Sequence, residues 1–478
     1  MTFTHDLIVI GAGPAGLAAA ATAADLGLRT LLLDEQPQPG GQIYRNVRVS
    51  SPRVQALLGP DYTRGNLLVK RVLDLRVDVR HETLVWDVAP DLVVTSLRGG
   101  HAFQVRAPQL VVASGAMERA SPLPGWTLPG VLNAGAAQIA LKSGGLVPAG
   151  RVVLAGAGPL LLLVACQLLE AGVELAGLVE TAPASNRRAA LRHLPAALAA
   201  PGYLAKGLRM IARLRRAGMP WHTQATALAV TGTDRATGLA FDVRGRRLQL
   251  AADTVLLHHG VIPNTQLSRL LRVDHHWSEA QLAWQVVADE FGQTSLAGLR
   301  MAGDGVAIAG ALAAEAAGTL AALGAASALG RIAAPDRDRR ASAPLRTLHR
   351  ERAVRPFLDA LYRPPPEIVT PADETIVCRC EEVSAGRVRE MARLGCQGPN
   401  QTKFFSRCGM GPCQGRICGN VVTQLLATEL GKSPGEVGAY RIRAPLKPVP
   451  VAALVGLLAE PSGDSRAPDE SARSTSHE

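Results

Sequence analysis

A glycine-rich turn near the start of the chain constrains its fold more than any other feature. The apolar run 6–10 is followed by Gly11, Gly13 and Gly16 in the spacing G-x-G-x-x-G, and then by an Ala- and Leu-rich stretch that reaches Leu26. This order predicts a strand, a tight turn and a helix. Gly11 permits the sharp turn, Gly13 lets the backbone approach a pyrophosphate, and Gly16 lets the helix pack closely on the strand. The helix N-terminus then presents free N–H groups to the phosphate.

Two acidic residues complete this pattern. Residues 30–33 predict a second strand, which ends at Asp34 and Glu35, about twenty residues after the glycines. A carboxylate at this place can accept hydrogen bonds from a ribose. A glycine-rich turn alone also occurs in ordinary α/β domains, but the strand, the helix and the acids together predict a dinucleotide-binding domain.

A second glycine-rich turn predicts a second domain of the same type. Residues 151–154 read as a strand that leads into Gly156 and Gly158, but Leu161 occupies the third glycine position. Because that glycine mainly allows close helix–strand packing, Leu161 implies a shifted helix and not a blocked phosphate site. We expect a Rossmann-like subdomain and regard NAD(P) binding as doubtful, preferring an inherited fold without a nicotinamide. The region lacks a Cys-x-x-Cys pair, which disfavours disulfide reductase chemistry, and Cys166 reads as a small core residue.

The cysteines are strongly clustered, since all of the seven except Cys166 lie between Cys378 and Cys418. A secreted disulfide scaffold would spread its cysteines through the chain, so this clustering favours a metal or redox site. The cluster contains a Cys-x-Cys pair and a Cys-x4-Cys pair, and the second pair lies on a glycine-rich loop that can wrap a compact metal cluster.

A [2Fe–2S] cluster is the favoured interpretation of these two pairs. Zinc sites more often use pairs spaced from Cys-x2-Cys to Cys-x4-Cys, whereas the first pair here is Cys-x-Cys, and the window contains no His. A structural zinc site and free thiols remain the alternatives. Cys396 and Cys418 are expected to be structural, and the proposed ligands are Cys378, Cys380, Cys408 and Cys413.

The net charge of +11 gives little guidance about partners. The basic residues are mostly Arg and are dispersed through the chain, with one local excess over residues 331–363. Aromatic residues make up only 4% of the chain, so it is poor in the stacking platforms that single-stranded nucleic acids use. We expect no nucleic-acid partner.

The sequence predicts neither a transmembrane segment nor an export signal. Residues 152–169 are strongly apolar, but their Gly-Ala-Gly-Pro interruption and Gln167 fit a buried strand, turn and helix better than a spanning helix. Residues 1–6 contain no Lys or Arg and lead to no cleavage pattern. We expect a cytoplasmic protein, with peripheral attachment to the inner membrane through its electron acceptor as a further option.

Two segments resemble the flavin-contacting parts of two-domain flavoproteins of the thioredoxin-reductase type. The first reads PGGQIYR and the second MAGDG. The resemblance implies an FAD cofactor bound by Gly41, Gln42, Gly303 and Asp304, with Asp304 on the ribityl chain. Taken alone, Asp304 would be explained more simply as a turn or helix-cap residue.

The C-terminal region carries the most specific resemblance. CRCEEV and NQTKFFSRCGMGPCQGRICG closely resemble the bacterioferritin-associated-ferredoxin-like [2Fe–2S] domain fused to flavoprotein subunits of opine oxidases, hydrogen cyanide synthases, hydroxyproline dehydrogenases and sarcosine-oxidase-like enzymes. DEQPQPGGQIYR, ASGAMERASPLPGWTLPGV and AGAGPLLLLVACQLL also look like the larger subunit of that group. The resemblance spans roughly residues 5–420.

This resemblance implies an FAD- and [2Fe–2S]-containing subunit of a heteromeric dehydrogenase that oxidises a C–N bond of an amino acid, imino acid or opine-type substrate. The implied partner is a smaller FAD-containing catalytic subunit, with a small ferredoxin-like subunit as a further option. The chain would relay electrons to a quinone, oxygen or another acceptor. Two alternatives stay open: an NAD(P)H-dependent reductase, and a scaffold subunit that binds its cofactors only structurally.

No catalytic residue is identified by sequence. The pairs His258-His259 and His275-His276 could titrate near neutrality, but we favour solvated or strand-end histidines. The chain shows no nucleophile elbow, metalloprotease motif or convincing carboxylate pair.

These placements predict an α/β protein with two Rossmann-like domains and a small, mainly helical cluster domain. The three prolines 364–366 disfavour a helix and indicate a linker. The Ser-, Asp- and Glu-rich end is expected to be disordered. The predicted organisation is an FAD domain over 1–115 and 259–330, a second Rossmann-like domain over 116–258, a linker over 331–373, the [2Fe–2S] domain over 374–450, and a tail over 451–478.

Overall fold

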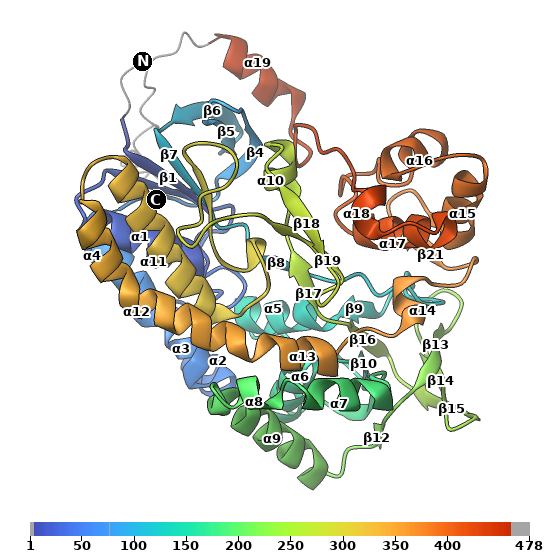
Figure 1. Cartoon of the computed structure of the whole chain (residues 1–478). Helices are drawn as coiled ribbons and strands as arrows, with labels where there is room; N and C mark the ends of the chain where they lie inside the picture. Colours follow the sequence, from blue (N-terminus) through green and yellow to red (C-terminus); the bar gives the residue numbers. More distant parts are fainter. Residues whose placement is uncertain (1–3, 76, 460–478) are drawn as a thin grey trace, which may run out of the picture.

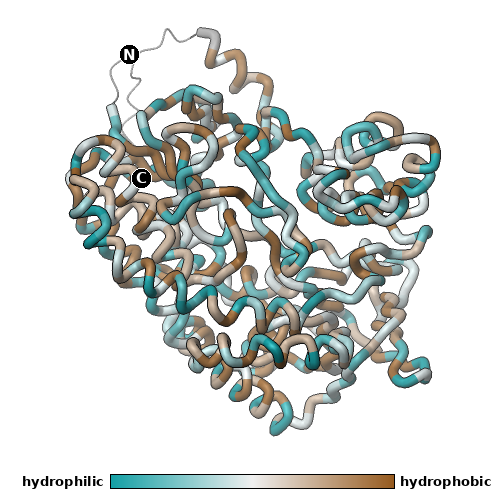
Figure 2. The backbone as a smooth tube through the Cα atoms, in the orientation of Figure 1, coloured by the Kyte–Doolittle hydropathy of each residue, from teal (hydrophilic) through white to brown (hydrophobic). Residues whose placement is uncertain are grey.

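The computed structural model describes residues 4–75 and 77–459. Two parallel β-sheets with their helices form the main body, and a small helical module stands at one side of it (Figure 1). Hydrophobic residues are concentrated inside the main body (Figure 2). This architecture confirms the predicted α/β class with two Rossmann-like domains and a helical C-terminal domain.

The first sheet has the strand order β20-β7-β1-β2-β3, with all neighbours parallel. Its strands are β1 (Leu7–Ile10), β2 (Thr30–Leu33), β3 (Asp78–Arg80), β7 (Gln109–Val112) and β20 (Leu299–Met301). Helices α1 (Pro14–Asp25), α4 (Gly65–Asp74) and α11 (Ala311–Ala328) belong to this domain, with α2 (Pro52–Leu58) and α3 (Pro60–Thr63) before α4. An antiparallel sheet of β4 (Leu84–Val88), β5 (Val93–Arg98) and β6 (His101–Arg106) is inserted before β7.

The second sheet has the order β12-β11-β10-β16-β9, also parallel. Its strands are β9 (Val131–Asn133), β10 (Val152–Gly156), β11 (Leu175–Glu180), β12 (Trp221–His222) and β16 (Thr254–His258). It carries the helices α5 (Ala134–Gly144), α6 (Pro159–Glu170), α7 (Ala184–Leu191), α8 (Leu194–Ala197) and α9 (Pro201–Arg216). A second antiparallel insert consists of β13 (Thr226–Thr231), β14 (Gly238–Val243) and β15 (Arg246–Ala251).

Two short antiparallel strands connect the domains. These strands are β8 (Ala116–Glu118) and β17 (Val261–Pro263). The chain continues from β17 through α10 (Gln266–Leu270) and the hairpin of β18 (His275–Ser278) and β19 (Ala283–Val286) before it returns to the first sheet. The first domain is therefore assembled from two separate segments of sequence.

Residues 331–373, predicted to be a linker, are folded. They contain α12 (Ala334–Ala353), α13 (Arg355–Leu361) and α14 (Pro366–Val369). α12 packs along α11, and α13 packs on α7. A proline stands in the first turn of each of these three helices, where the missing N–H has no helical partner to lose. Pro335, Pro356 and Pro366 thus lie in the first turns of these helices, while Pro344 lies inside α12. We expected the prolines 364–366 to exclude a helix, but α14 begins at Pro366.

The small module contains β21 (Ile376–Cys378), β22 (Val383–Ser384), α15 (Ala385–Arg393), α16 (Pro399–Ser406), α17 (Gly419–Leu430) and α18 (Pro434–Val437). The chain then returns to the first domain, where the Leu446 N–H donates to the Trp86 carbonyl at 2.8 Å and α19 (Val451–Ala459) packs on β6 (Figure 1). The predicted tail thus begins as a helix. The end that we expected to be disordered, from residue 460, lies outside the described residues.

Among the described residues, one helix is long and apolar enough to cross a membrane. This helix is α11, and it packs between α1 and α12 with 61% of its residues buried in the protein. A buried core helix of a globular domain passes the same test of length and composition. The apolar stretch 152–169 forms β10, a turn and α6, as the sequence predicted.

Candidate functional site

The first glycine turn has the local geometry that its sequence predicts. Gly11 has a φ of 99°, and a Cβ there would lie 2.6 Å from the Ala113 carbonyl oxygen. A Cβ on Gly16 would lie 1.7 Å from the Gly11 carbonyl oxygen, so α1 approaches the end of β1 closely. Gly13 precedes α1, and no side chain caps this helix. The first N–H groups of α1 are therefore available to bind an anion.

The segment that contains Gly41 and Gln42 lies against this turn. The Gly40 N–H donates to the Ala12 carbonyl at 2.8 Å, and a Cβ on Gly41 would lie 2.6 Å from the Cα of Gly13. Two backbone segments thus meet with no side chain between them. This cradle fits the close backbone approach that the pyrophosphate of a dinucleotide needs.

The two acids after β2 have different surroundings, because Asp34 is buried and Glu35 is exposed. The Asp34 carboxylate accepts hydrogen bonds from the backbone N–H groups of Ala12 and Gln36, and burial raises its pKa. Glu35 pairs with Lys447 from the C-terminal segment. Asp34 therefore fixes the glycine turn to the end of β2, and Glu35 is the acid that reaches the surface.

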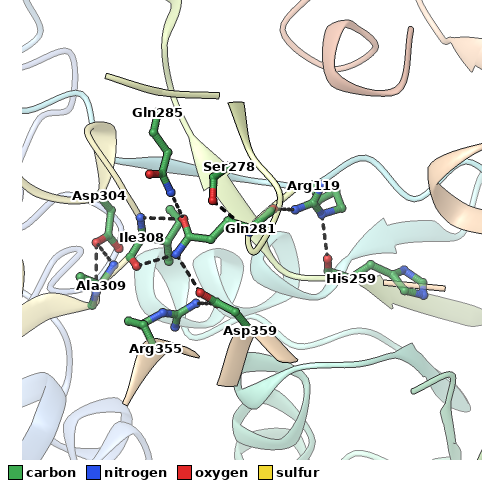
Figure 3. A network of polar contacts seen from close by, with 11 residues as sticks. Arg119, His259, Ser278, Gln281, Gln285, Asp304, Ile308, Ala309, Arg355 and Asp359 are labelled. Carbon is green, nitrogen blue, oxygen red and sulfur yellow. Dashed lines mark hydrogen bonds and ion pairs between the residues drawn. The ribbon is translucent and has the colours of Figure 1, made fainter. Parts of the chain in front are cut away.

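Asp304 lies in the 3-10 helix η1 (Gly303–Gly305), directly after β20. One of its carboxylate oxygens accepts hydrogen bonds from the N–H groups of Ala309 at 2.9 Å and Gly310 at 3.0 Å (Figure 3). Burial raises the pKa of this carboxyl. The second oxygen is left to meet another donor, as a ribityl-binding role requires.

Gly303, in the same turn, contacts the first helix. A Cβ on Gly303 would lie 2.8 Å from the Cβ of Ala15. The predicted flavin residues of segments 11–16 and 303–304 therefore lie side by side, although most of the first domain's sequence separates them. The residues present fit an FAD molecule.

A network of polar contacts surrounds the Asp304 turn (Figure 3). The Gln281 side chain accepts a hydrogen bond from the Ile308 N–H at 3.2 Å and donates one to the Ile308 carbonyl at 3.0 Å. The same amide donates to Asp359 of α13 at 3.2 Å, and Asp359 pairs with Arg355. Helix α13, in the segment predicted as a linker, thus helps to hold the loop after Asp304.

Arg119 is a buried cation that sequence reasoning missed. Its guanidinium donates to the backbone carbonyls of His259, Leu282 and Gln281 (Figure 3). Burial lowers its pKa to about 10, so the side chain stays charged at neutral pH. The three acceptors lie 140, 163 and 162 residues away in the sequence. No local pattern could identify this contact.

Lys142 is a second buried cation, and it joins the two nucleotide-type domains. Its Nζ donates to the Gln42 carbonyl at 3.0 Å and to Oε1 of Gln138 at 3.0 Å. The Gln138 amide in turn donates to Gln167 of α6 at 2.9 Å. Burial, and secondarily the charge of Arg45, lowers the pKa of Lys142 to about 7. The lysine therefore links α5 to the segment predicted to bind the flavin.

The second glycine turn has a buried histidine beside it. A Cβ on Gly158 would lie 2.9 Å from Nε2 of His258, the last residue of β16. Nδ1 of His258 lies 2.6 Å from Oε1 of Glu118, whose other oxygen accepts a hydrogen bond from the Gly135 N–H at 2.9 Å. Leu161 is buried in α6. The glycine at position 158 thus makes room for an imidazole.

Two of the paired histidines are neutral near pH 7. Burial lowers the pKa of His259 to about 3, and its Nδ1 lies 2.8 Å from the Ser121 hydroxyl. Burial also lowers the pKa of His275 to about 4. The preferred interpretation as a solvated side chain is therefore wrong for His259, which is buried. His275 is partly buried at the start of β18, which agrees with a strand-end histidine.

Three of the clustered cysteines have converging sulfur atoms. The sulfurs of Cys378, Cys408 and Cys418 all lie within 4.8 Å of one another, and all three residues are buried. The Gly409 N–H donates to the Cys378 sulfur at 3.4 Å. Hydrogen bonds from the Cys408 and Cys418 thiols lower the pKa of Cys378 to about 2. The same contacts raise the pKa of Cys408 to about 12 and also raise the pKa of Cys418. Cys378 is therefore the sulfur of this group that is favoured as a thiolate, the form of cysteine that binds metals.

Cys380 and Cys413 form a second group. Burial raises the pKa of Cys380, and the Cys413 backbone N–H and thiol lie close enough to the Cys380 sulfur to affect this pKa as well. Cys380 is exposed and Cys413 is partly buried. A Cβ on Gly411 would lie 2.3 Å from the Cβ of Cys380, so the glycine lets the second loop reach the first.

Of the four predicted ligands, Cys378 and Cys408 thus lie in the group of three converging sulfurs, and Cys380 and Cys413 lie beside each other. A [2Fe–2S] cluster takes four thiolates, two on each iron, and two pairs fit this need. Cys418, expected to be only structural, joins the first group because the start of α17 returns to β21. Three converging thiols also fit part of a tetrahedral zinc site. Cys396 is buried and does not belong to the converging group.

Hydrogen bonds hold the cysteine module against the crossover region of the flavin-type domains. Leu282, in the β18–β19 hairpin, accepts hydrogen bonds both from Arg119 and from the module. The contacts are Trp126 Nε1 to the Ile376 carbonyl at 2.6 Å, Asn420 Nδ2 to the Leu282 carbonyl at 2.9 Å, and Arg272 Nη2 to the Ile442 carbonyl at 3.0 Å. The cysteine loops therefore sit beside the region that joins the two nucleotide-type domains.

Two family models match this chain. The pyridine nucleotide-disulphide oxidoreductase model matches residues 5–318, and the sarcosine oxidase A3 domain model matches residues 373–456. Together with the paired sheets and the glycine turns, the first match defines a flavoprotein oxidoreductase.

Known proteins with similar sequences show which flavoprotein oxidoreductases this chain resembles. The opine oxidase A subunit of Agrobacterium tumefaciens is 44% identical over 95% of this chain and 92% of that protein. The hydrogen cyanide synthase subunit HcnB of Pseudomonas aeruginosa is 32% identical over 95% of this chain and 99% of its own length. The chain belongs to the pyridine nucleotide-disulphide oxidoreductase family, in the branch that contains the opine oxidase A subunit and HcnB. This confirms the resemblance predicted from the cysteine and flavin motifs.

A solved structure shows the same fold. L-proline dehydrogenase from P. horikoshii superimposes with a TM-score of 0.67 at 19% sequence identity, over 94% of this chain and 79% of that one. The arrangement of all three parts therefore occurs in a protein of low sequence similarity.

Lys142 makes a testable contribution to the pH dependence of stability. Its pKa falls from 10.5 to about 7 on folding, so between pH 7 and 10 unfolding takes up a proton. The free energy of unfolding should rise with pH by up to about 1.4 kcal/mol per unit from this residue. Lys142→Met should lower the slope measured by urea unfolding at several pH values in this window.

The matched control for this experiment is Lys70→Met. Lys70 is exposed in α4 and pairs with Asp74, so this variant should keep the wild-type slope. Equal slopes for the wild type and Lys142→Met would show that Lys142 keeps an ordinary pKa in the folded protein.

Proposed function

We propose that this chain is the FAD- and [2Fe–2S]-containing subunit of a heteromeric dehydrogenase or oxidase. The enzyme would oxidise a C–N bond of an amino acid, imino acid or opine-type substrate, and this subunit would relay the electrons to an acceptor. One observation carries the proposal. A group of three converging cysteines and a neighbouring pair of cysteines stand in a module that is hydrogen-bonded to the crossover region of a flavoprotein fold.

The first domain supplies the residues that would hold FAD. Gly11, Gly13 and Gly41 form the cradle for the pyrophosphate, with the N–H groups of α1 as donors. Gly16 and Gly303 allow the close contacts that shape this cradle. Gln42 is anchored through its carbonyl by Lys142. Ribose contacts are assigned to Asp34 and Glu35, and the ribityl contact to Asp304.

FAD would supply two-electron chemistry, since it accepts a hydride equivalent from a CH–NH unit and passes electrons on singly. The chain's own residues position it. Asp304 is held by two backbone N–H groups, and the loop that provides them is fixed by Gln281. These contacts come from the chain itself and fix the position of Asp304.

The cysteine module supplies the residues that would hold the [2Fe–2S] cluster. Cys378 and Cys408 would bind one iron and Cys380 and Cys413 the other. The Gly409 N–H, which already donates to a ligand sulfur, would stabilise the charge of the cluster. The exposed position of Cys380 places one side of the cluster near solvent, where an electron acceptor can approach.

The relatives support a heteromeric enzyme of this class. The opine oxidase and hydrogen cyanide synthase relatives are both named as subunits, and their similarity extends over nearly the whole of this chain. The named activities of these relatives support a substrate that contains an oxidisable C–N bond. We infer that a smaller flavoprotein subunit binds that substrate.

The ligand assignment is tested by a pair of serine substitutions. Cys413→Ser should remove most of the iron and acid-labile sulfide, whereas Cys418→Ser should retain both. The readouts are iron and sulfide analysis and the visible absorption of the purified protein. Cys166→Ser, in α6 of the second domain, is the control for general effects. Loss of iron in Cys418→Ser with retention in Cys413→Ser would move the fourth ligand to Cys418.

The direction of electron flow is tested by anaerobic reduction of the complex that contains both subunits. An opine-type secondary amine should bleach the flavin absorbance rapidly, and NADH should not. Fast bleaching by NADH would favour the alternative of an NAD(P)H-dependent reductase that uses the turn of Gly156 and Gly158. Full turnover by a Cys408→Ser complex without its cluster would favour a scaffold subunit.

A further inference from the structure

A cavity of about 50 Å³ lies between the crossover strands and the cysteine module. Met117 and Ile262 form its wall on the side of β8 and β17, while Gly415 and Gly419 form its wall on the module. Gly415 follows Cys413 by two residues, and Gly419 directly follows Cys418. The cavity thus stands between the proposed flavin domain and the proposed cluster, outside the residues assigned to either cofactor.

Arg269 of α10 is the unusual residue of this cavity. Its guanidinium lies 4.6 Å from the centre of the Trp284 ring, and its Nη2 is buried without a hydrogen-bond partner among the described residues. Burial lowers its pKa only to about 10, so it is charged at neutral pH. A buried cation that lacks an acceptor is costly unless something compensates its charge.

The described wall of the cavity offers Arg269 the face of the Trp284 ring and Oε1 of Gln266, a buried acceptor that also lacks a partner, but no carboxylate to balance its charge. Its lining residues include a second arginine, Arg416, and no Asp or Glu. Nε of Arg416 and Nε1 of Trp284 are also buried N–H groups without a partner in the described part of the chain. A third arginine, Arg272, donates to the carbonyl of Ile442, another lining residue. The cavity therefore presents several donors and a net positive charge.

We propose that this cavity binds the oxyanion of a small ligand, a carboxylate or a phosphate, with Arg269 and Arg416 as its cationic contacts. The oxygens of such a group accept several hydrogen bonds at once, which matches the unpartnered N–H groups of the wall. Bidentate pairing with guanidinium groups adds geometric specificity. A bound anion would also tie α10 to the loop of the cysteine module, because the two arginines come from these two parts.

The size of the cavity limits the ligand. One water needs about 10–15 Å³ on this measure, so a space of about 50 Å³ holds a group of a few non-hydrogen atoms. Pockets for nucleotide-sized ligands are about 300 Å³ or larger. The proposed site therefore takes a carboxylate- or phosphate-sized group and not a whole nucleotide.

The test is calorimetric titration of the full-length protein, loaded with its cofactors, with inorganic phosphate and with acetate in separate experiments. Whichever of the two anions binds, Arg269→Gln should weaken its affinity by about ten-fold or more, as expected for the loss of a charge-assisted hydrogen bond. Arg346→Gln, on the exposed side of α12, removes the same charge elsewhere and should leave the affinity unchanged.

Binding of phosphate alone would identify a phosphate ligand, and binding of acetate alone a carboxylate ligand. Arg416→Gln repeats the test from the module side if Arg269→Gln fails to fold. As a second measurement, selenate soaked into crystals should give an anomalous peak in contact with Arg269. The proposal would be overturned if neither anion binds, or if Arg269→Gln binds the anion with the same affinity as the wild type. None of these readouts depends on turnover, so the site and the proposed enzyme activity fail separately.

Discussion

Close contacts between backbones, at positions where glycine replaces a side chain, hold the first domain together. Gly16 lets α1 approach the Gly11 carbonyl, and a Cβ on Gly318 of α11 would lie 2.0 Å from the Ala15 carbonyl oxygen. Side chains at these positions would push the two helices outward, because the nearest atoms belong to backbone that cannot rotate away. The same contacts bring the Asp304 turn beside α1, so both halves of the proposed FAD site depend on them.

Buried cations connect the parts of the molecule beyond this domain. Arg119 joins the crossover to the β18–β19 hairpin through carbonyl oxygens, and Lys142 joins α5 to the Gln42 segment. Carbonyl dipoles satisfy the buried charge without a counter-ion, but only in one arrangement of the surrounding backbone. Arg269 lacks such acceptors, which is why its cavity stands out as a site for an external anion. At each of these connections, the position of the surrounding backbone therefore decides whether a buried basic side chain finds its hydrogen-bond acceptors.

Local patterns predicted the parts of the fold that depend on neighbours in sequence. The glycine turns, the apolar strands and the cysteine pairs all carry their physical reason within a few residues of sequence. The positions of Cys418, His258 and Lys142 could not be predicted this way, because each depends on how distant helices and strands pack. The prolines 364–366 predict a linker because proline disfavours a helix interior, but proline is well suited to a first turn, and Pro366 begins α14. α12 even contains Pro344 in its interior, where its packing along α11 supports the helix.

The central claim is that one chain carries both a flavin and an iron–sulfur cluster. The most direct measurement is the content of FAD, iron, acid-labile sulfide and zinc in the purified protein with whatever subunit co-elutes. The account predicts FAD bound to this chain, together with iron and sulfide in equal amounts of about two per chain. Zinc without sulfide, or a chain that holds no flavin, would contradict it.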